Sequence, residues 1–250
     1  MKQSFSWWCF DGRVELEEML QAAKRIGLSG VELIEPEFWP VVKKHGLEIS
    51  AYGGHASIES GLNQRANHAR IEGELLEKIR LAEKWSVPNL IVFAGSRSPG
   101  ISDEVGAQIT AECLARVAPM AESAGVNLIL ELLNSKVDHI GYQADHTSWG
   151  VKVCEIVGSP RVKLLYDVYH MQIMEGDVIR TIRENHAHIA HYHTAGNPGR
   201  NNLDDTQELN YAAIAKAIAG TGFEGYIGHE FVPLGDPILA LEQAFKLCDV

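Results

Sequence analysis

Short apolar runs alternate with longer amphipathic segments along the whole chain. Runs bounded by polar or glycine-containing segments are typical of strands in a buried parallel sheet. The predicted strands are Ser4–Phe10, Gly30–Leu33, Leu47–Ala51, Asn89–Phe93, Val126–Leu132, Val162–Val168, Ile189–Thr194 and Gly225–Phe231. Their alternation with helical segments indicates repeated β-α units rather than a sandwich or a helical bundle.

Apolar residues recur at helical spacing between these runs. The predicted helices are Val14–Ile26, Ile71–Trp85, Val105–Ala124, Trp149–Ile156, Asp177–Asn185, Tyr211–Gly220 and Pro237–Cys248. Glu37–Lys44 is a shorter and weaker helix because Pro40 interrupts it. Glycines such as Gly27 and Gly125 stand between a helix and the next strand, where a left-handed cap is required.

This order predicts an α/β fold, a (β/α)8 TIM barrel formed as a single domain by residues 1–250. The length of 250 residues agrees with the ~250 residues usual for that fold. A doubly wound open sheet is the alternative, but a dinucleotide-binding version needs a glycine-rich fingerprint after its first strand, and SWWCFDGR contains none.

Composition narrows the class of partner. There are 22 Lys and Arg against 33 Asp and Glu, a net charge of −11, and the basic residues do not cluster, which argues against a nucleic acid or an anionic membrane. A small solute is the expected partner. The four cysteines lie far apart without a C-x-x-C pair, and MKQSFSWWCF lacks a signal-peptide core, so we expect a reduced, cytoplasmic protein.

Each of the last four predicted strands ends with a side chain that can bind a metal: Glu131, Asp167, His193 and Glu230. A charged residue at one strand end is ordinary because water is near, but four in consecutive strands are harder to explain in that way. Alternation places the residues two positions earlier on the same face: Ile129, Leu165, His191 and Gly228. We expect Gly228 to leave room for the ring of His191.

Three carboxylates and one imidazole form an oxygen-rich set of donors without a thiolate. Such a set suits Mn²⁺, Mg²⁺ or Co²⁺ better than a structural zinc. Carboxylates placed together without a cation repel one another, and a divalent ion removes that cost. In a TIM barrel the carboxyl ends of the strands carry the active site, so the four positions fall on the functional face.

The second half of the chain resembles the xylose-isomerase-like sugar isomerase and epimerase superfamily, and within it most closely the hydroxypyruvate isomerase group. The resemblance rests on DVYHMQ-x-MEGD-x-I-x-TIRE at Asp167–Glu184, PGR at Pro198–Arg200 and E-x-NY at Glu208–Tyr211. It implies that Glu131, Asp167, His193 and Glu230 hold one divalent metal, Mn²⁺ or Mg²⁺ with Co²⁺ possible. It also implies that Glu131 and Glu230 are the catalytic acid/base pair and that His170 and Arg200 contact the substrate.

The resemblance implies a metal-dependent isomerase that interconverts a small α-hydroxy aldehyde/ketone pair, hydroxypyruvate or sugar-like, through a metal-bound enediolate. This chain has HYHTA at the position where sequences of that group resemble HFQ-x-A, so His193 stands in place of a glutamine. A histidine at this position is more similar to the sequences of the ketose 3-epimerases. A ketose 3-epimerase with the same metal and glutamate pair is therefore the alternative. More distant alternatives are a nuclease similar to endonuclease IV, which the net charge opposes, and a non-catalytic sugar-binding barrel.

Candidate residues are fewer in the first half. His55 follows the third predicted strand beside Gly53 and Gly54, and we include it as a substrate-binding residue. Trp7 is included as an apolar wall for a sugar-like substrate. Phe38 and Trp39, if exposed, would suggest an interface in a homo-oligomer.

Overall fold

The computed structural model describes residues 1–250, which form two compact units. The first unit contains residues 1–50, 177–186 and 192–250, and the second contains residues 51–176 and 187–191. Strand β8 (Ile189–Thr194) begins in the second unit and ends in the first. The chain therefore passes between the units inside a strand that carries His193.

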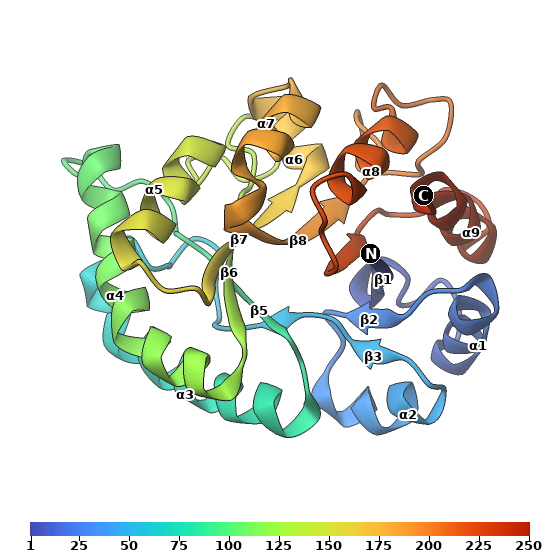
Figure 1. The fold of residues 1–250 in the computed structure, drawn as a ribbon, viewed down its shortest axis with the longest axis horizontal. Coiled ribbons are helices and arrows are strands. Elements are labelled where there is room, and N and C mark those ends of the chain that lie inside the picture. Colours follow the sequence, from blue (N-terminus) through green and yellow to red (C-terminus); the bar gives the residue numbers. More distant parts are fainter. The chain divides into compact units, whose positions relative to one another are not determined.

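The first unit is built on parallel strands. Strand β1 (Lys2–Ser6) pairs with β2 (Gly30–Glu32) and with β9 (Tyr226–His229), and β2 pairs with β3 (Glu48–Ile49). Helix α1 (Leu16–Ile26) packs on α9 (Pro237–Cys248), α9 on α8 (Tyr211–Ala219), and α8 on α7 (Val178–Asn185). The short α2 (Trp39–Lys44) lies against β3 (Figure 1).

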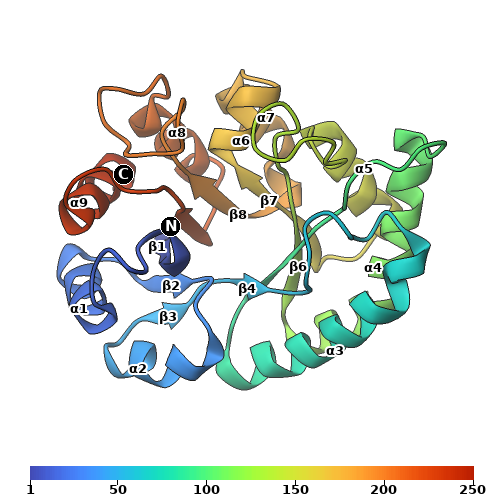
Figure 2. The same ribbon diagram turned by 180° about the vertical axis from the view of Figure 1, so that it is seen from behind.

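The second unit repeats this architecture. Its parallel strands pair in the order β4 (Tyr52–Gly53), β5 (Asn89–Val92), β6 (Asn127–Glu131) and β7 (Val162–Asp167). Helix α3 (His68–Trp85) packs on α4 (Asp103–Ala124), and α4 packs on α5 (Thr147–Val157), as Figure 2 shows. Helix α6 (Val168–Met174) starts directly at the end of β7.

The predicted elements are recovered with three informative differences, one of which is helix α6 over Val168–Met174, where the sequence predicts no helix. The first strand ends at Ser6, and a 3₁₀ helix over Trp7–Cys9 takes the place of its predicted second half. The predicted third strand shortens to β3, and an extra strand, β4, follows it. Further 3₁₀ turns cover Pro36–Phe38, Arg65–Asn67 and His186–His188. Trp7 and Trp8 consequently lie on a 3₁₀ helix, where the alternation of side chains along a strand no longer applies.

Local chemistry explains where several helices begin and end. The hydroxyl of Ser102 accepts a hydrogen bond from the Val105 N–H at the start of α4, and Asp236 caps α9 in the same way. Gly27 ends α1 at φ 116°, a conformation that only glycine adopts readily. Asp167 caps α6, because its carboxylate accepts from the His170 N–H at 3.0 Å.

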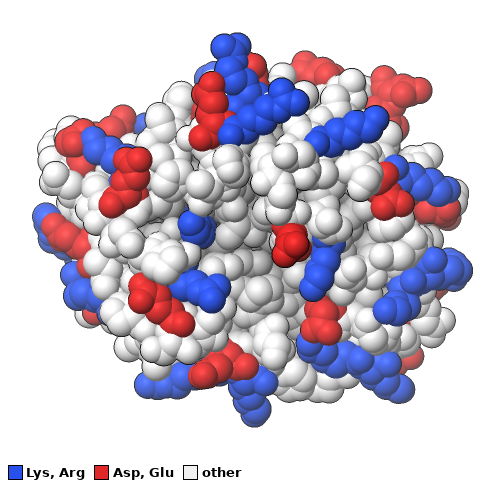
Figure 3. All heavy atoms as spheres, in the orientation of Figure 1, with Lys and Arg blue, Asp and Glu red and all other residues white.

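Charge is spread over the surface. In Figure 3, basic and acidic side chains are interspersed on the face that is drawn. None of the helices is both long and apolar enough to cross a membrane. All four cysteines are buried and free of disulfides.

An aromatic cluster fixes the turn after β1. Phe5, Phe10 and Phe231 are fully buried, with edge-to-face ring pairs at centroid distances of 5.4 Å for Phe5–Phe10 and 5.6 Å for Phe10–Phe231. Phe10 lies in the middle of this cluster, directly after the 3₁₀ helix. The cluster therefore anchors both the 3₁₀ helix and the segment that follows β9.

We predict that Phe10→Ala lowers the free energy of unfolding by about 3–5 kcal/mol, because it removes a buried ring and leaves a cavity. Urea unfolding followed by circular dichroism measures the change. Phe38→Ala is the matched control, since Phe38 is 36% exposed and its loss should change stability by no more than about 0.5 kcal/mol. Equal effects of the two substitutions would contradict the anchoring role of Phe10.

Candidate metal centre and active site

Two of the four candidate ligands lie in the second unit, at the ends of neighbouring strands. Glu131 is the last residue of β6 and Asp167 the last of β7, and both are buried, with exposed fractions of 5% and 0%. Strands β6 and β7 are paired, with Glu131 opposite Leu165. Carboxylate oxygens of Glu131 and Asp167 lie within 4.8 Å of each other, close enough to share one cation.

His170 is fully buried beside this pair, on α6. Its Nδ1 lies 3.2 Å from the backbone nitrogen of Asn134 and 2.7 Å from the side-chain nitrogen of the same residue. A backbone N–H can only donate, so Nδ1 is the acceptor and a neutral ring carries its proton on Nε2. That Nε2 lies 3.8 Å from Asp167 Oδ2. His170 is therefore oriented as a donor next to Asp167.

The other two candidate ligands lie in the first unit, where His193 of β8 contacts Glu230, the residue after β9. His193 Nδ1 is 3.1 Å from Glu230 Oε2, and both side chains are buried. The other ring nitrogen, Nε2, is 3.0 Å from Oε1 of Glu32, a residue at the end of β2. The imidazole of His193 thus lies between two carboxylates.

Arg200 also reaches Glu230. It lies in the loop after β8 with a positive φ of 57°, and its guanidinium is 2.5 Å from Glu230 Oε2. The indole N–H of Trp8 donates to Glu230 Oε1 at 2.9 Å, and Arg200 stacks over the Trp8 ring at 5.4 Å. Burial alone would raise the pKa of Glu230, but His193 and Arg200 outweigh it and hold that pKa well below its usual range. Glu230 is therefore an anion with donors on both oxygens.

Trp8 and Glu32 are site residues that sequence reasoning missed. The sequence predicts Trp8 inside a strand over Ser4–Phe10, but the strand ends at Ser6. Glu32 does end a predicted strand, so extending the strand-end comparison to the first half of the chain would have found it. Trp7 lines a cavity of about 580 Å³ with Asp11, Arg13 and Phe38, and its role as an apolar wall for a substrate stays a prediction.

The sequence suggests an interface at Phe38 and Trp39 only if both side chains are exposed, and Trp39 does not meet that condition. Its side chain is fully buried, and its indole N–H donates to the Ile34 carbonyl at 2.9 Å. Phe38 is partly exposed at 36%. A single partly exposed ring does not make an apolar surface, so nothing in this segment indicates a subunit interface.

His55 lies just after β4, but both of its ring nitrogens contact the backbone. The Phe93 N–H donates to Nε2 at 2.9 Å, and Nδ1 lies 3.0 Å from the Ala56 carbonyl. Burial lowers the pKa of His55, which keeps the ring neutral. Its nitrogens therefore hold loop backbone together, and a role in substrate binding stays a prediction that would have to use ring carbons.

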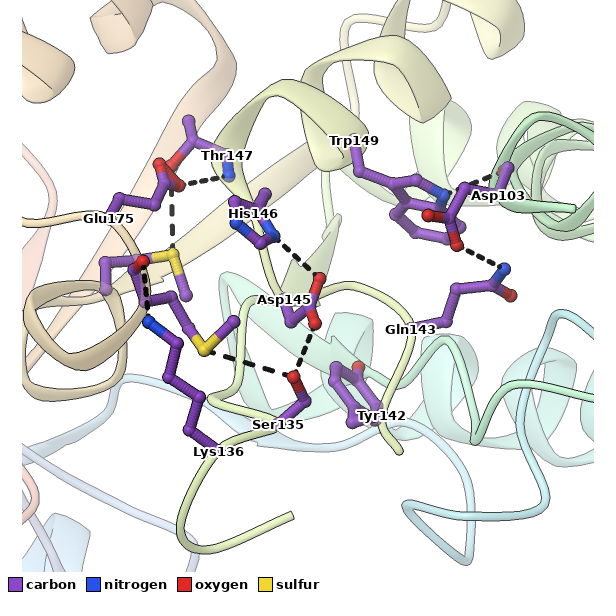
Figure 4. Close-up of polar contacts among 12 residues, drawn as sticks. Asp103, Ser135, Lys136, Tyr142, Gln143, Asp145, His146, Thr147, Trp149 and Glu175 are labelled. Atoms are coloured by element: carbon purple, nitrogen blue, oxygen red, sulfur yellow. Dashed lines mark hydrogen bonds and ion pairs between the residues drawn. The ribbon is translucent and has the colours of Figure 1, made fainter. Parts of the chain in front are cut away.

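The long loop between β6 and α5 is tied down by Asp145, as Figure 4 shows. Asp145 accepts hydrogen bonds from Ser135 at 2.5 Å and from Arg97 at 3.0 Å, and it contacts His146 Nδ1 at 2.8 Å. Burial would raise the pKa of Asp145, but these donors lower it overall. The network fixes the loop that carries Asn134 and hence the orientation of His170.

The donors within each unit fit a hard divalent cation. Glu131 and Asp167 supply carboxylate oxygens, and His193 and Glu230 supply an imidazole nitrogen and a carboxylate, all buried and without a thiolate. A further group, His68, Glu72 and Cys113, is less suitable, because the Arg116 guanidinium already contacts Glu72 and His68. The structure thus offers candidate ligands for a divalent metal.

The chain belongs to the xylose isomerase-like TIM barrel family, whose family model matches residues 20–247. This confirms the (β/α)8 barrel that the alternation of strands and helices predicts. Among curated relatives, the putative hydroxypyruvate isomerase of Homo sapiens is 26% identical over 255 residues, covering 94% of this chain and 90% of the relative. The 2-oxo-tetronate isomerase of Cupriavidus necator is 36% identical over 122 residues, which are 49% of this chain and only 46% of that protein.

Solved structures agree on the fold. A structure described as AP endonuclease, family 2, from Brucella melitensis has a TM-score of 0.82 at 21% identity, covering 96% of this chain and 97% of the other. L-ribulose 3-epimerase has a TM-score of 0.82 at 20% identity, covering 100% and 94%. At these identities the likeness concerns the fold. The relatives named as isomerases and epimerases together support an isomerase enzyme.

His229 is a buried histidine beside the candidate ligands whose pKa predicts a pH dependence. Its Nδ1 lies 2.8 Å from Thr194 Oγ1 and its Nε2 lies 2.9 Å from Gln3 Oε1. Gln3 donates its amide N–H to the Phe245 carbonyl, so Oε1 is the atom that accepts from His229. Burial lowers the pKa of His229 from 6.5 to about 4, so the ring stays neutral in the folded protein.

We predict that His229 makes the fold less stable as the pH falls from about 6.5 to about 4, because the unfolded chain takes up a proton that the folded chain resists. This group contributes its full stability above 6.5. The loss at or below pH 4 is about 3 kcal/mol, from a shift of some 2.5 pKa units. His229→Gln should flatten that part of the curve of unfolding free energy against pH, and an unchanged curve would contradict the assignment.

Proposed function

We propose that this protein is a metal-dependent isomerase that moves a proton between neighbouring carbons of a small α-hydroxy carbonyl compound. The observation that carries the proposal is the pair of buried acidic side chains, Glu131 and Glu230, each at a strand end beside other metal-capable side chains. Relatives that match nearly the whole chain are named hydroxypyruvate isomerases. Hydroxypyruvate or a related hydroxy-carbonyl acid is therefore the first substrate class.

We infer that Glu131, Asp167, His193 and Glu230 together hold one divalent ion, Mn²⁺ or Mg²⁺, with Co²⁺ as a substitute. The support is chemical and comes from the fold family, because the carboxyl ends of TIM-barrel strands share one face. When bound, the ion acts as a Lewis acid that stabilises negative charge on a carbonyl oxygen. A structural relative at 17% identity was solved with a bound zinc atom, which fits a metal in this fold.

In this proposal the protein side chains divide the work. Glu131 removes the proton from the hydroxyl-bearing carbon next to the carbonyl and returns it to the former carbonyl carbon. Glu230, on the opposite side, takes the hydroxyl proton and passes it to the former carbonyl oxygen, and each group contributes about 10²–10⁴-fold. His170 donates its Nε2 proton to a substrate oxygen, since its Nδ1 is already an acceptor for Asn134. Arg200, held by Glu230 and the Trp8 ring, supplies a planar cation for a substrate carboxylate or a pair of hydroxyls.

A ketose 3-epimerase is the second candidate. In that reaction the proton returns to the opposite face of the same carbon, and the same two glutamates serve. The observation that favours it is His193, which stands at the position where the motif of the hydroxypyruvate isomerases has a glutamine. The fold likeness to L-ribulose 3-epimerase is compatible with either reaction.

A cytoplasmic location stays a prediction from the widely spaced, disulfide-free cysteines.

Deuterium incorporation separates the two candidates. We propose incubating the Mn²⁺-loaded protein with hydroxypyruvate, a 2-oxo-tetronate and a panel of ketoses in deuterated water, and locating the label by NMR. Isomerisation places deuterium on the carbon next to the original position, whereas epimerisation exchanges the proton of one carbon. No exchange with any compound would count against both reactions.

We predict that Glu131→Gln and Glu230→Gln each lower turnover by at least about 100-fold while the fold is kept, because an amide cannot accept the substrate proton. Steady-state turnover and circular dichroism measure the two effects. Glu112→Gln is the matched control. Glu112 is an exposed partner of Arg65 in the middle of α4 and belongs to none of the groups of candidate ligands. Substantial activity in both strand-end variants would refute the acid/base pair.

A further inference from the structure

Glu32 is a carboxylate that the fold buries completely. It is the last residue of β2 and has no exposed surface. Three hydroxyls surround it: Ser4 donates to Oε2 at 3.2 Å, Ser6 to Oε1 at 2.9 Å and Ser50 to Oε2 at 2.9 Å. All three serines are themselves fully buried. A side chain that rarely occurs in protein interiors is thus held in one position by three fixed donors.

Strand β9, on the other side of β1, leaves space for this carboxylate. Gly228 on β9 is paired with Ser4, and a Cβ added to Gly228 would lie 2.0 Å from Glu32 Oε1. The three atoms nearest to that position all belong to Glu32. The missing side chain at 228 thus serves the carboxylate of Glu32. That Gly228 also makes room for the His191 ring stays a prediction.

The fixed carboxylate contacts only one side of the His193 ring. Glu32 Oε1 lies 3.0 Å from Nε2, whereas Nδ1 faces Glu230 at 3.1 Å. A neutral ring carries one proton between the two carboxylates, and with a divalent cation offsetting the charge of Glu230 that proton is favoured on Nε2, where Glu32 accepts it. With the proton on Nε2, a neutral ring presents the lone pair of Nδ1 on the side of Glu230. Metal-binding histidines are commonly oriented by a carboxylate in this way.

Stability alone does not account for Glu32. Removing a carboxylate from water costs several kcal/mol, and well-packed apolar residues at such a place are often as stable or more so. The arrangement of three serines and one glycine around a single acid therefore indicates a role that needs the charge. Glu32 Oε1 is the atom shared by Ser6 and His193, so the anchor acts directly on the ring contact.

We propose that Glu32 is a positioning residue for the metal centre: anchored by Ser4, Ser6 and Ser50, it keeps the proton of His193 on Nε2 and so makes Nδ1 available as a metal ligand. The inference rests on the proposed function, because it takes His193 as a ligand. It goes beyond that function by assigning a role to a residue outside the four ligands. Glu32 touches neither metal nor substrate in this role.

Cobalt affinity tests the role without relying on turnover. Chelator-treated protein is titrated with Co²⁺ by calorimetry and by visible absorption, and the melting temperature is recorded for each variant. We expect Glu32→Gln to raise the Kd for Co²⁺ about 10- to 100-fold, the range found when a carboxylate behind a ligating histidine is removed. Ser6→Ala, which loosens the anchor but keeps the charge, should raise it about 3- to 10-fold and remains informative if Glu32→Gln does not fold.

Ile49→Val is the matched control. Ile49 is fully buried on β3 and pairs with Val31, next to Glu32 along β2, but it offers no polar atom to the site. It should lower the melting temperature and leave the Kd for Co²⁺ unchanged. A Kd that follows the melting temperature across all variants would show that Glu32 acts only on the stability of the fold, and would overturn the proposal.

A double-mutant cycle isolates the contact with His193. In a His193→Ala background, Glu32→Gln should change the Kd for Co²⁺ by less than about 3-fold, because there is no side-chain donor left to orient. An equal effect in both backgrounds would overturn the positioning role. If wild-type protein binds Co²⁺ and Glu32→Gln binds it equally well, only this inference fails. If wild-type protein binds no Co²⁺, the proposed metal-dependent function fails with it.

Discussion

Burial of acidic side chains at the ends of parallel strands is the constraint around which the site is built. A carboxylate loses its hydration when it is buried, so the protein must replace water with fixed donors. Glu230 receives the indole N–H of Trp8 and the guanidinium of Arg200. Glu32 receives three serine hydroxyls. In both cases the donors come from segments distant in sequence, so the charge is stable only when the fold is complete.

The same constraint links local structure to chemistry in the second unit. Asp167 ends β7, caps α6 and lies beside Glu131. Because the carboxylate accepts the His170 N–H, one residue sets the start of the helix and the position of the histidine that follows. Asn134 fixes the other side of the His170 ring, and Asp145 fixes the loop of Asn134. The orientation of the His170 ring thus depends on backbone geometry rather than on a single contact.

Much of the fold follows from the sequence because apolar periodicity is a strong signal in buried parallel strands. The predicted Asn89–Phe93 and Ile189–Thr194 match β5 and β8 closely. The prediction fails at Trp7 and Trp8, where β-propensity continues but the chain turns into a 3₁₀ helix packed on Phe10. That turn depends on tertiary packing with Phe231, which no local pattern contains. The four candidate ligands at strand ends can be singled out from chemistry and spacing, whereas the serines around Glu32 look like ordinary strand residues in the sequence.

In the proposed function, the identity of residue 193 sets the type of atom that is offered to the metal. The fixed carboxylate of Glu32 favours a hydrogen-bond donor on the side of residue 193 that faces it. Histidine meets this demand with Nε2–H and keeps Nδ1 as an acceptor; glutamine would meet it with its amide N–H and keep its carbonyl oxygen. Both therefore present a lone pair on the Glu230 side, one from nitrogen and one from oxygen. In the proposed function, the choice of substrate also depends on groups that reach beyond the shared carbonyl, and Arg200 over Trp8 is the clearest of these. The position of Trp8 depends on the turn after β1, so the segment that the sequence predicts least well would also bear on the substrate.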